Sequence, residues 1–388
     1  MAWGQPGLTK LQYISNGSVA WGASGLPVST PLQQIGILRS LRLLQNGSPT
    51  YTGTTYDAAL GPWNAFSRLS LISNSQAPIF SLSGYGAYLV TLLKRGLEGQ
   101  SGAPDVPVVS ESNHTDTSYA YNFPANALAS APANQQILFA LDLPVAQRIR
   151  SLGGDIGMFI LQNPNIQLQF AFTIGSASSS SPYTESGTGA GINALMWYVS
   201  STSGNSVTLG TPQVDIVKEQ YEAVSNAADY PNLEWVSQWI EEPFQSAVNA
   251  ASQITWTKLP VAGLLCRVMA WVVDGGHVTE GATPECGVRT NLLTAGNAVT
   301  LTYNTGTTKF AETGQEAIVR QRKQLTFDMP QGVFFYDLLG GPDLNLSDVL
   351  NTARVPNIQM QMNTASALGS TNSQAHMIYQ TLLPVSFQ

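Results

Sequence analysis

Two aspartates stand in similar short motifs and could in principle act as an acid/base pair. Asp142 lies in Leu-Asp-Leu-Pro, and Asp328 lies in Phe-Asp-Met-Pro. Two neighbouring carboxylates are the machinery of glycoside hydrolysis, so the pair raises this chemistry first. Such a pair would require the two segments to face each other. We favour a structural role, in which both aspartates mark equivalent strand ends of two related domains.

Other residue types that carry catalysis are scarce. The chain has three histidines, His114, His277 and His376, and no two of them have the spacing of metal ligands. GxSxG, HExxH and P-loop motifs are absent from the sequence. The GTGAG stretch at 187–191 is only superficially like a dinucleotide loop, because it follows serines rather than a strand. The sequence therefore predicts no catalytic, metal or cofactor-binding residues, and we expect a protein that is not an enzyme.

Cysteine usage is equally sparse. Cys266 and Cys286 are too few for a disulfide framework or a zinc site, and a single bridge between them stays open. Cys266 lies in the apolar run 263–273, so we expect it to be a small buried side chain.

The composition favours a soluble protein whose surface is covered by partners or by uncharged polar side chains. Charged residues make up 11% of the 388 residues, against a typical ~25%, while 43% are hydrophobic. A net charge of −7 argues against a broad phosphate-binding surface. We expect the basic cluster at 320–323 to be a solvated face or loop. The most apolar stretch, 259–273, is short and contains Arg267, so we expect no membrane span in it.

The elements that would position these residues are organised by an internal repeat. Residues 139–170 and 325–362 both open with apolar-Asp-apolar-Pro, pass through Gly-Gly and reach Pro-Asn-Ile-Gln. Self-similarity at this long spacing predicts two versions of one domain. We divide the chain into an N-terminal arm, a first domain with a long loop at 95–135, an interdomain linker and a second domain: 1–34, 35–228, 229–258 and 259–388.

Alternating polarity and turn residues predict many short strands. The first of them, 35–46, is expected to end at the turn dipeptide Asn46-Gly47. The segment 214–224 is compatible with a strand or a helix. Trp235, Trp239 and Phe244 in the linker have the spacing of a short amphipathic helix, which Pro243 limits. Further strands are expected at 66–73, 79–84, 192–201, 263–273 and 299–306.

The repeat carries a family resemblance. The block from Leu143-Pro144-Val145-Ala146 to Ile166–Phe170 resembles a strand-loop-strand block of the major capsid proteins of tectiviruses, tailless icosahedral phages with an internal membrane. In the second copy, a basic stretch at 320–323 followed by 327–337 (FDMPQGVFFYD) is similar to the block that opens the late strands of that family's second barrel. The family's N-terminal helix has no evident counterpart in residues 1–34.

The resemblance implies an all-β chain of two tandem eight-stranded antiparallel jelly rolls, a double jelly roll, with short helices in the linker and loops. It further implies a bacteriophage major capsid protein whose homotrimers, pseudo-hexagonal in outline, tile an icosahedral virion. The implied partners are neighbouring capsomers, penton and minor capsid proteins and the internal viral membrane, without sequence-specific nucleic-acid binding. Assembly is expected in the host cytoplasm.

Two alternatives remain at this stage. A jelly-roll carbohydrate- or receptor-binding protein of a virion could stack sugars on loop aromatics, namely Tyr119, Tyr121 and Phe123. A jelly-roll glycosidase is the least favoured, because no carboxylate pair declares itself.

Overall fold

The structure is a computed structural model of the chain. It describes residues 11–21, 25–52, 55–57, 62–74, 78–97, 137–149, 154–163, 165, 167–175, 197–199, 206–222, 235–243, 253–257, 263–273, 299–304, 306–325, 329, 332–339, 349–355, 357–363 and 374–384. Within these residues, no helix has the length and apolar character needed to cross a membrane.

The first barrel is built from two groups of four strands. One group, in spatial order, is β1 (Leu11–Ala20), β13 (Ser206–Tyr221), β3 (Ile37–Thr52) and β7 (Ile137–Pro144). The facing group is β6 (Pro78–Leu82), β5 (Phe66–Ser73), β11 (Leu168–Ile174) and β2 (Pro27–Pro31). Residues alternate between buried and half-buried along β11, as a strand covering a barrel core should.

The second barrel repeats this plan. Its first group is β14 (Trp235–Pro243), β22 (Gln374–Pro384), β16 (Leu264–Val273) and β19 (Val333–Asp337). Its second group is β18 (Thr307–Glu312), β17 (Val299–Tyr303), β21 (Gln359–Asn363) and β15 (Gln253–Trp256). Two short strands extend these sheets: β10 (Phe159–Ile160) pairs with β3, and β20 (Leu350–Asn351) pairs with β16. Two separate two-stranded sheets are formed by β4 (Thr55–Asp57) with β12 (Trp197–Val199) and by β8 (Gln147–Ile149) with β9 (Gly154–Ile156).

Strand for strand, the two barrels match in chain order and in hydrogen-bonded neighbours. The match extends to a register shift at the same place in each barrel. In the first, Leu38 and Ser40 of β3 face consecutive residues of β13; in the second, Leu265 and Arg267 of β16 face consecutive residues of β22. A shared β-bulge fixes the correspondence residue by residue, so Ser40 is the counterpart of Arg267. The prediction of two eight-stranded jelly rolls is therefore confirmed.

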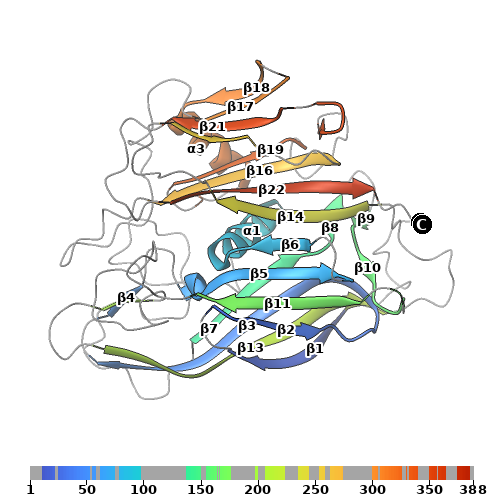
Figure 1. The fold of residues 1–388 in the computed structure, drawn as a ribbon, viewed down its shortest axis with the longest axis vertical. Helices are drawn as coiled ribbons and strands as arrows, with labels where there is room; N and C mark the ends of the chain where they lie inside the picture. The colour runs from blue at the N-terminus through green and yellow to red at the C-terminus, as the bar shows by residue number, and fades with distance from the viewer. Residues whose placement is uncertain are drawn as a thin grey trace.

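A parallel strand pair joins the barrels. β14 of the second barrel pairs with β6 of the first, with Trp239 opposite Phe80 and Ile240 opposite Ser81. Through this pair one nine-stranded sheet runs from β19 to β2, with β20 attached to β16. Figure 1 shows the result as a stack of strands, with the blue-to-green first barrel below and the yellow-to-red second barrel above.

Each barrel has a helix after the β5–β6 hairpin or its counterpart. α1 (Gly84–Leu97) follows β6, and α3 (Gly314–Leu325) follows β18. Nearly every described side chain of α1 is buried, because α1 lies between the first barrel and β14, β16 and β22 (Figure 1). A helix apolar on all sides is expected in such a place. α3 buries one side only, through Gly314, Ala317, Gln321 and Leu325.

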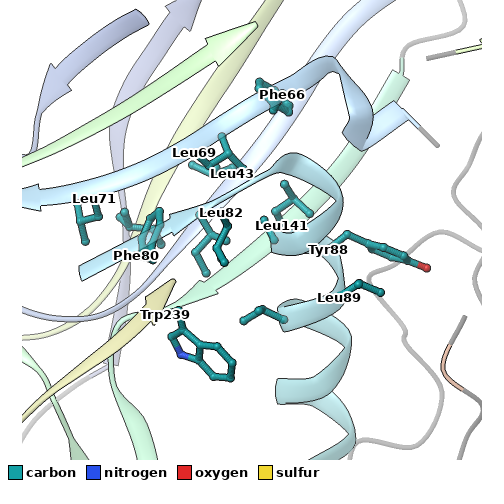
Figure 2. Packing of buried hydrophobic residues seen from close by; sticks show 14 of the residues in the cluster. Leu43, Phe66, Leu69, Leu71, Phe80, Leu82, Tyr88, Leu89, Leu141 and Trp239 are labelled. Atoms are coloured by element: carbon teal, nitrogen blue, oxygen red, sulfur yellow. The ribbon is translucent and has the colours of Figure 1, made fainter. Parts of the chain in front are cut away.

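The largest hydrophobic cluster crosses the boundary between the barrels. It contains core residues of the first barrel together with Trp239, Met269, Trp271 and Ile378 of the second. Figure 2 shows Trp239 in this cluster with Phe80 and Leu82 of β6 and Leu89 of α1. The second barrel's own core forms a separate cluster on the other face of β14, β16 and β22. The two barrels therefore share one continuous hydrophobic cluster.

Several expectations are confirmed and others are corrected. The strands at 66–73 and 263–273 are present, and 214–224 is a strand, as part of β13. The prediction of a turn at Asn46-Gly47 is wrong. β3 continues to Thr52, because β13 pairs with it along its length. The linker helix is also wrong, because Trp235 and Trp239 belong to β14.

The predicted arm and linker hold barrel strands. β1 and β2 lie within residues 1–34, and β14 and β15 lie within 229–258. The first barrel ends with β13 at Tyr221 and the second begins with β14 at Trp235. The loop predicted at 95–135 lies outside the described residues from residue 98 onward.

The sequence repeat itself is out of structural register. Pro144 ends β7 and faces Ser40, whereas the residue facing Arg267, the counterpart of Ser40, is Asp337 of β19. Pro330 precedes β19, which begins at Val333, and so does not mark an equivalent strand end. In the strand registers Pro144 therefore corresponds to Asp337, although the domain duplication that the repeat suggested is present in the structure.

Candidate functional site

The contact between the barrels is centred on one carboxylate. Glu241 of β14 accepts hydrogen bonds from the Ser83 backbone N–H (2.5 Å) and the Ser83 hydroxyl (3.0 Å), just before α1. From the second barrel, the Trp271 indole N–H donates to the same carboxylate at 3.0 Å, and His376 Nδ1 lies 3.0 Å from Oε1. Glu241 therefore links the first barrel to β16 and β22.

Burial and hydrogen bonding act on Glu241 in opposite directions. The side chain is only 4% exposed, and this burial by itself raises the pKa of the carboxyl. The contacts with His376 and Ser83 outweigh burial and hold the pKa of Glu241 below its ordinary value. Glu241 is therefore a carboxylate in the folded protein at neutral pH.

His376 completes the cluster from β22. Its ring stacks on the Trp271 indole, with centroids 4.2 Å apart and planes 13° from parallel. Its Nε2 lies 3.0 Å from Oε1 of Gln374, two residues earlier on the same strand. The stacking and this contact hold the ring beside Glu241.

A second buried polar network crosses the same face of the second barrel. Arg267 Nε lies 3.1 Å from Oδ1 of Asp337, and both side chains are almost fully buried. Arg267 also donates to Gln380 at 2.7 Å, and the Gln380 amide donates to Ser237 of β14 at 2.8 Å. This network ties β14 to β16, β19 and β22, and buried ion pairs of this kind require such additional partners.

α3 has the same N-terminal cap built from local residues. Thr313 and Glu316 form a capping box: the Thr313 hydroxyl accepts from the Glu316 N–H at 3.2 Å, and Glu316 accepts from the Thr313 N–H at 2.9 Å. Ser83 likewise caps α1 by accepting from the Gly86 N–H at 2.9 Å. In α1 the acid of the box is Glu241, which comes from the other barrel.

The Ser83–Glu241–His376 arrangement does not form a catalytic triad. In a triad the histidine bonds the serine hydroxyl and takes its proton. Here the hydroxyl of Ser83 donates to the carboxylate instead, and the same oxygen caps α1. Among the described residues no group of three or more His, Cys, Asp or Glu side chains could hold a metal ion. The hydrogen bonds of Glu241 hold the two barrels together, and this structural role is the one that the geometry supports.

The structure brings Asp142 to a cation rather than to a second carboxylate. Arg42 Nε lies 2.7 Å from Asp142 Oδ1, on the outer face of β3 and β7. Asp328 lies outside the described residues, as do His114, His277, Cys286 and 187–191.

Two further expectations have clear outcomes. Cys266 is fully buried in β16, as expected. Its thiol is free, and burial raises its pKa to about 12. The basic cluster 320–323 lies in α3 and is only partly a solvated face. Arg320 packs over the Tyr336 ring and donates to Glu312 and to the Phe335 carbonyl, and Gln321 is buried.

Comparison with solved structures identifies the fold. The chain matches the structure of the Sulfolobus turreted icosahedral virus at 12% identity and TM-score 0.64, covering 97% of this chain and 91% of that one. It matches the PBCV-1 virus capsid at 14% identity and TM-score 0.60, covering 96% and 94%. It matches the Faustovirus major capsid protein at 12% identity and TM-score 0.55, covering 100% and 92%.

These structures are double jelly-roll capsid proteins, and the chain has the same fold over almost its whole length. No protein-family model matches the sequence, and neither does any curated protein. At these identities the likeness establishes the fold.

Proposed function

We propose that this protein is a major capsid protein whose homotrimers tile an icosahedral virion shell. Each trimer presents six barrels in a hexagonal outline and adjoins neighbouring capsomers. Penton and minor capsid proteins and a membrane on the inner face are the further partners expected from the tectivirus-like resemblance.

The observation that carries this proposal is the side-by-side contact of two barrels of equal topology. β14 and β6 form one sheet, and a shared hydrophobic cluster and the buried Glu241 fix the barrels together. A subunit of this kind supplies two similar lateral units, as a hexagonal lattice built from trimers requires. The full-length match to capsid proteins of several viruses supports the same function.

The low charge of the chain agrees with this function. With only 11% charged residues, much of the surface is suited to contact with other protein rather than with solvent.

Native mass measurement of the purified chain, together with negative-stain images, tests the proposal. We expect a three-subunit particle with a hexagonal outline. A chain that stays monomeric at high concentration would contradict the proposal.

A further inference from the structure

Each barrel has one edge strand that corresponds to β14 and one edge strand that corresponds to β6. Inside the chain, β14 of the second barrel pairs with β6 of the first. Their counterparts are β1 of the first barrel and β18 of the second, and each of these lies at the end of its sheet. An exposed strand edge offers backbone donors and acceptors to another chain.

The registers map β1 onto β14 residue by residue. Tyr13 faces Glu219 of β13, and Trp239 faces Gln380 of β22, which is the counterpart of Glu219. Tyr13 is therefore the counterpart of Trp239. The flanking residues agree as well: Gln12-Tyr13-Ile14 corresponds to Gln238-Trp239-Ile240. The edge sequence that binds β6 is thus nearly repeated on β1.

The same mapping relates β18 to β6. Phe310 faces Leu301 of β17, and Phe80 faces Leu71 of β5, with a register shift next to each pair. Phe310 is therefore the counterpart of Phe80, the residue that lies opposite Trp239 in the parallel pair. Both halves of the aromatic contact are present again on the two outer edges.

Exposure distinguishes the internal contact from these edges. Trp239 is 5% exposed, whereas Tyr13 is 58% exposed. In the helices, Leu89 of α1 is fully buried, whereas its α3 counterpart Val319 is 67% exposed. Tyr13 and Val319 are among the five large hydrophobic side chains that stand out as exposed in the described part of the chain. Two of these five thus occupy positions that the internal contact buries.

The outer edges are also more polar than the internal contact. Met269 and Phe335, which pack against the first barrel, have Arg42 and Asp142 as counterparts, and these two form an ion pair. On α3, Arg322 and Lys323 replace the buried Leu92 and Leu93 of α1. Surfaces that must be soluble before they associate are more polar than permanently buried ones.

We propose that β1 of one copy pairs in parallel with β18 of a second copy, with Tyr13 opposite Phe310 and Ile14 opposite Ala311. This seam reproduces the β14–β6 contact between chains and covers Val319. The seam joins different surfaces head to tail, and an interface of this kind forms a ring when its rotation closes. In the proposed trimer, three copies give six barrels in alternating internal and seam contacts. The inference rests on the proposed trimer and names the surface that forms it.

Cysteine cross-linking tests the register. In the double variant Ile14→Cys/Ala311→Cys, residues that pair across the seam lie within disulfide reach. We expect mild oxidation of the trimer to give a covalent three-chain species on non-reducing gels, which a reductant returns to single chains. The two single variants and the pair Ser29→Cys/Ala311→Cys are the controls. Ser29 is exposed on β2, another edge strand, and should give no such species.

The outcomes separate this inference from the proposed function. Trimers that form without an Ile14–Ala311 cross-link, or with equal cross-linking in the Ser29 control, would overturn the seam and leave the capsid function standing. A chain that never forms trimers would overturn both.

A second pair of variants tests the aromatic contact directly. Tyr13→Trp copies the internal residue Trp239, and we expect it to keep the trimer intact. Tyr13→Asp places a charge opposite Phe310, and we expect trimers to dissociate at a concentration at least tenfold higher than for the unmodified protein. Circular dichroism of the dissociated monomers should match in both variants. Unchanged dissociation of the folded Tyr13→Asp protein would contradict the seam.

Discussion

Gly86 and Glu241 together take the space that one residue, Glu316, takes in the other helix. A Cβ atom on Gly86 would lie 2.3 Å from Oε2 of Glu241. In α1 the position three residues after the cap is Gly86, which has no side chain, and the carboxylate of Glu241 from the second barrel lies there. In α3 the acid of the cap is therefore a residue of its own helix, whereas in α1 it is a residue of the other barrel.

The variant Gly86→Ala should destabilise the protein, because the added methyl group meets the carboxylate. Overpacking of this kind costs about 1–3 kcal/mol, and we expect a lower midpoint in thermal or denaturant unfolding. The double variant Gly86→Ala/Glu241→Ala is the control. If the clash with Glu241 is the cause, the alanine at 86 should cost little in that background. An equal cost in both backgrounds would point to another cause.

Glu241→Gln and Glu316→Gln compare the two caps. Glu241 is buried, accepts hydrogen bonds from Ser83 and Trp271 and lies 3.0 Å from His376, and breaking one partner of a buried charged network costs about 3–5 kcal/mol. Glu316 is exposed, so its replacement should change the unfolding midpoint only slightly. Denaturant titrations of the two variants check this order. Equal losses would show that Glu241 acts only as a helix cap.

Acid should weaken the protein through Glu241. The pKa of its carboxyl is lower in the folded state than in the unfolded chain, where it is about 4.3. The unfolded chain therefore binds the proton first, and the stabilisation, complete above about pH 5, is lost as the pH falls through the folded pKa. Unfolding midpoints measured from pH 6 to pH 3 should fall more steeply for the unmodified protein than for Glu241→Gln. Parallel curves would exclude this group as the cause.

Lys218 should make the stability of the protein depend on pH at alkaline pH. It is buried in β13, its Nζ donates to the Gln33 carbonyl at 3.0 Å, and burial lowers its pKa from 10.5 to about 8. Between these values the unfolded chain holds the proton and the folded chain does not, so stability from this group rises with pH. Lys218→Met should therefore raise the unfolding midpoint more at pH 7 than at pH 10. A gain that does not change with pH would contradict this account.

The sequence predicted the strands whose pattern is local. The segments 66–73 and 263–273 carry their own alternation or apolar run, and the structure has strands there. The duplicated all-β fold followed from the repeat, even though Pro144 corresponds to Asp337 in the strand registers. α1 was not predicted, although apolar residues predominate in 84–97 and nearly all of its described side chains are buried.

The contact between the barrels could not be predicted from the sequence. Ser83 and Glu241 are 158 residues apart, so no spacing rule connects the two halves of this cap. Trp235 and Trp239 are four residues apart and imitate a helix, whereas tertiary pairing with β22 and β6 makes them a strand. The shared triplets at 12–14 and 238–240 were a signal, but a three-residue match gains meaning only from the strand register.

The parallel pair between β6 and β14 also has a consequence during synthesis of the chain, because β6 is made before its partner β14. A ribosome completes β6 long before it reaches Trp235, so the first barrel emerges with this edge, and Phe80 on it, open to other chains. A neighbouring nascent chain that already carries β14 can fill the gap in place of the chain's own strand. The order of synthesis therefore leaves β6 as an open strand edge, the kind of feature through which unfinished multidomain chains can exchange domains.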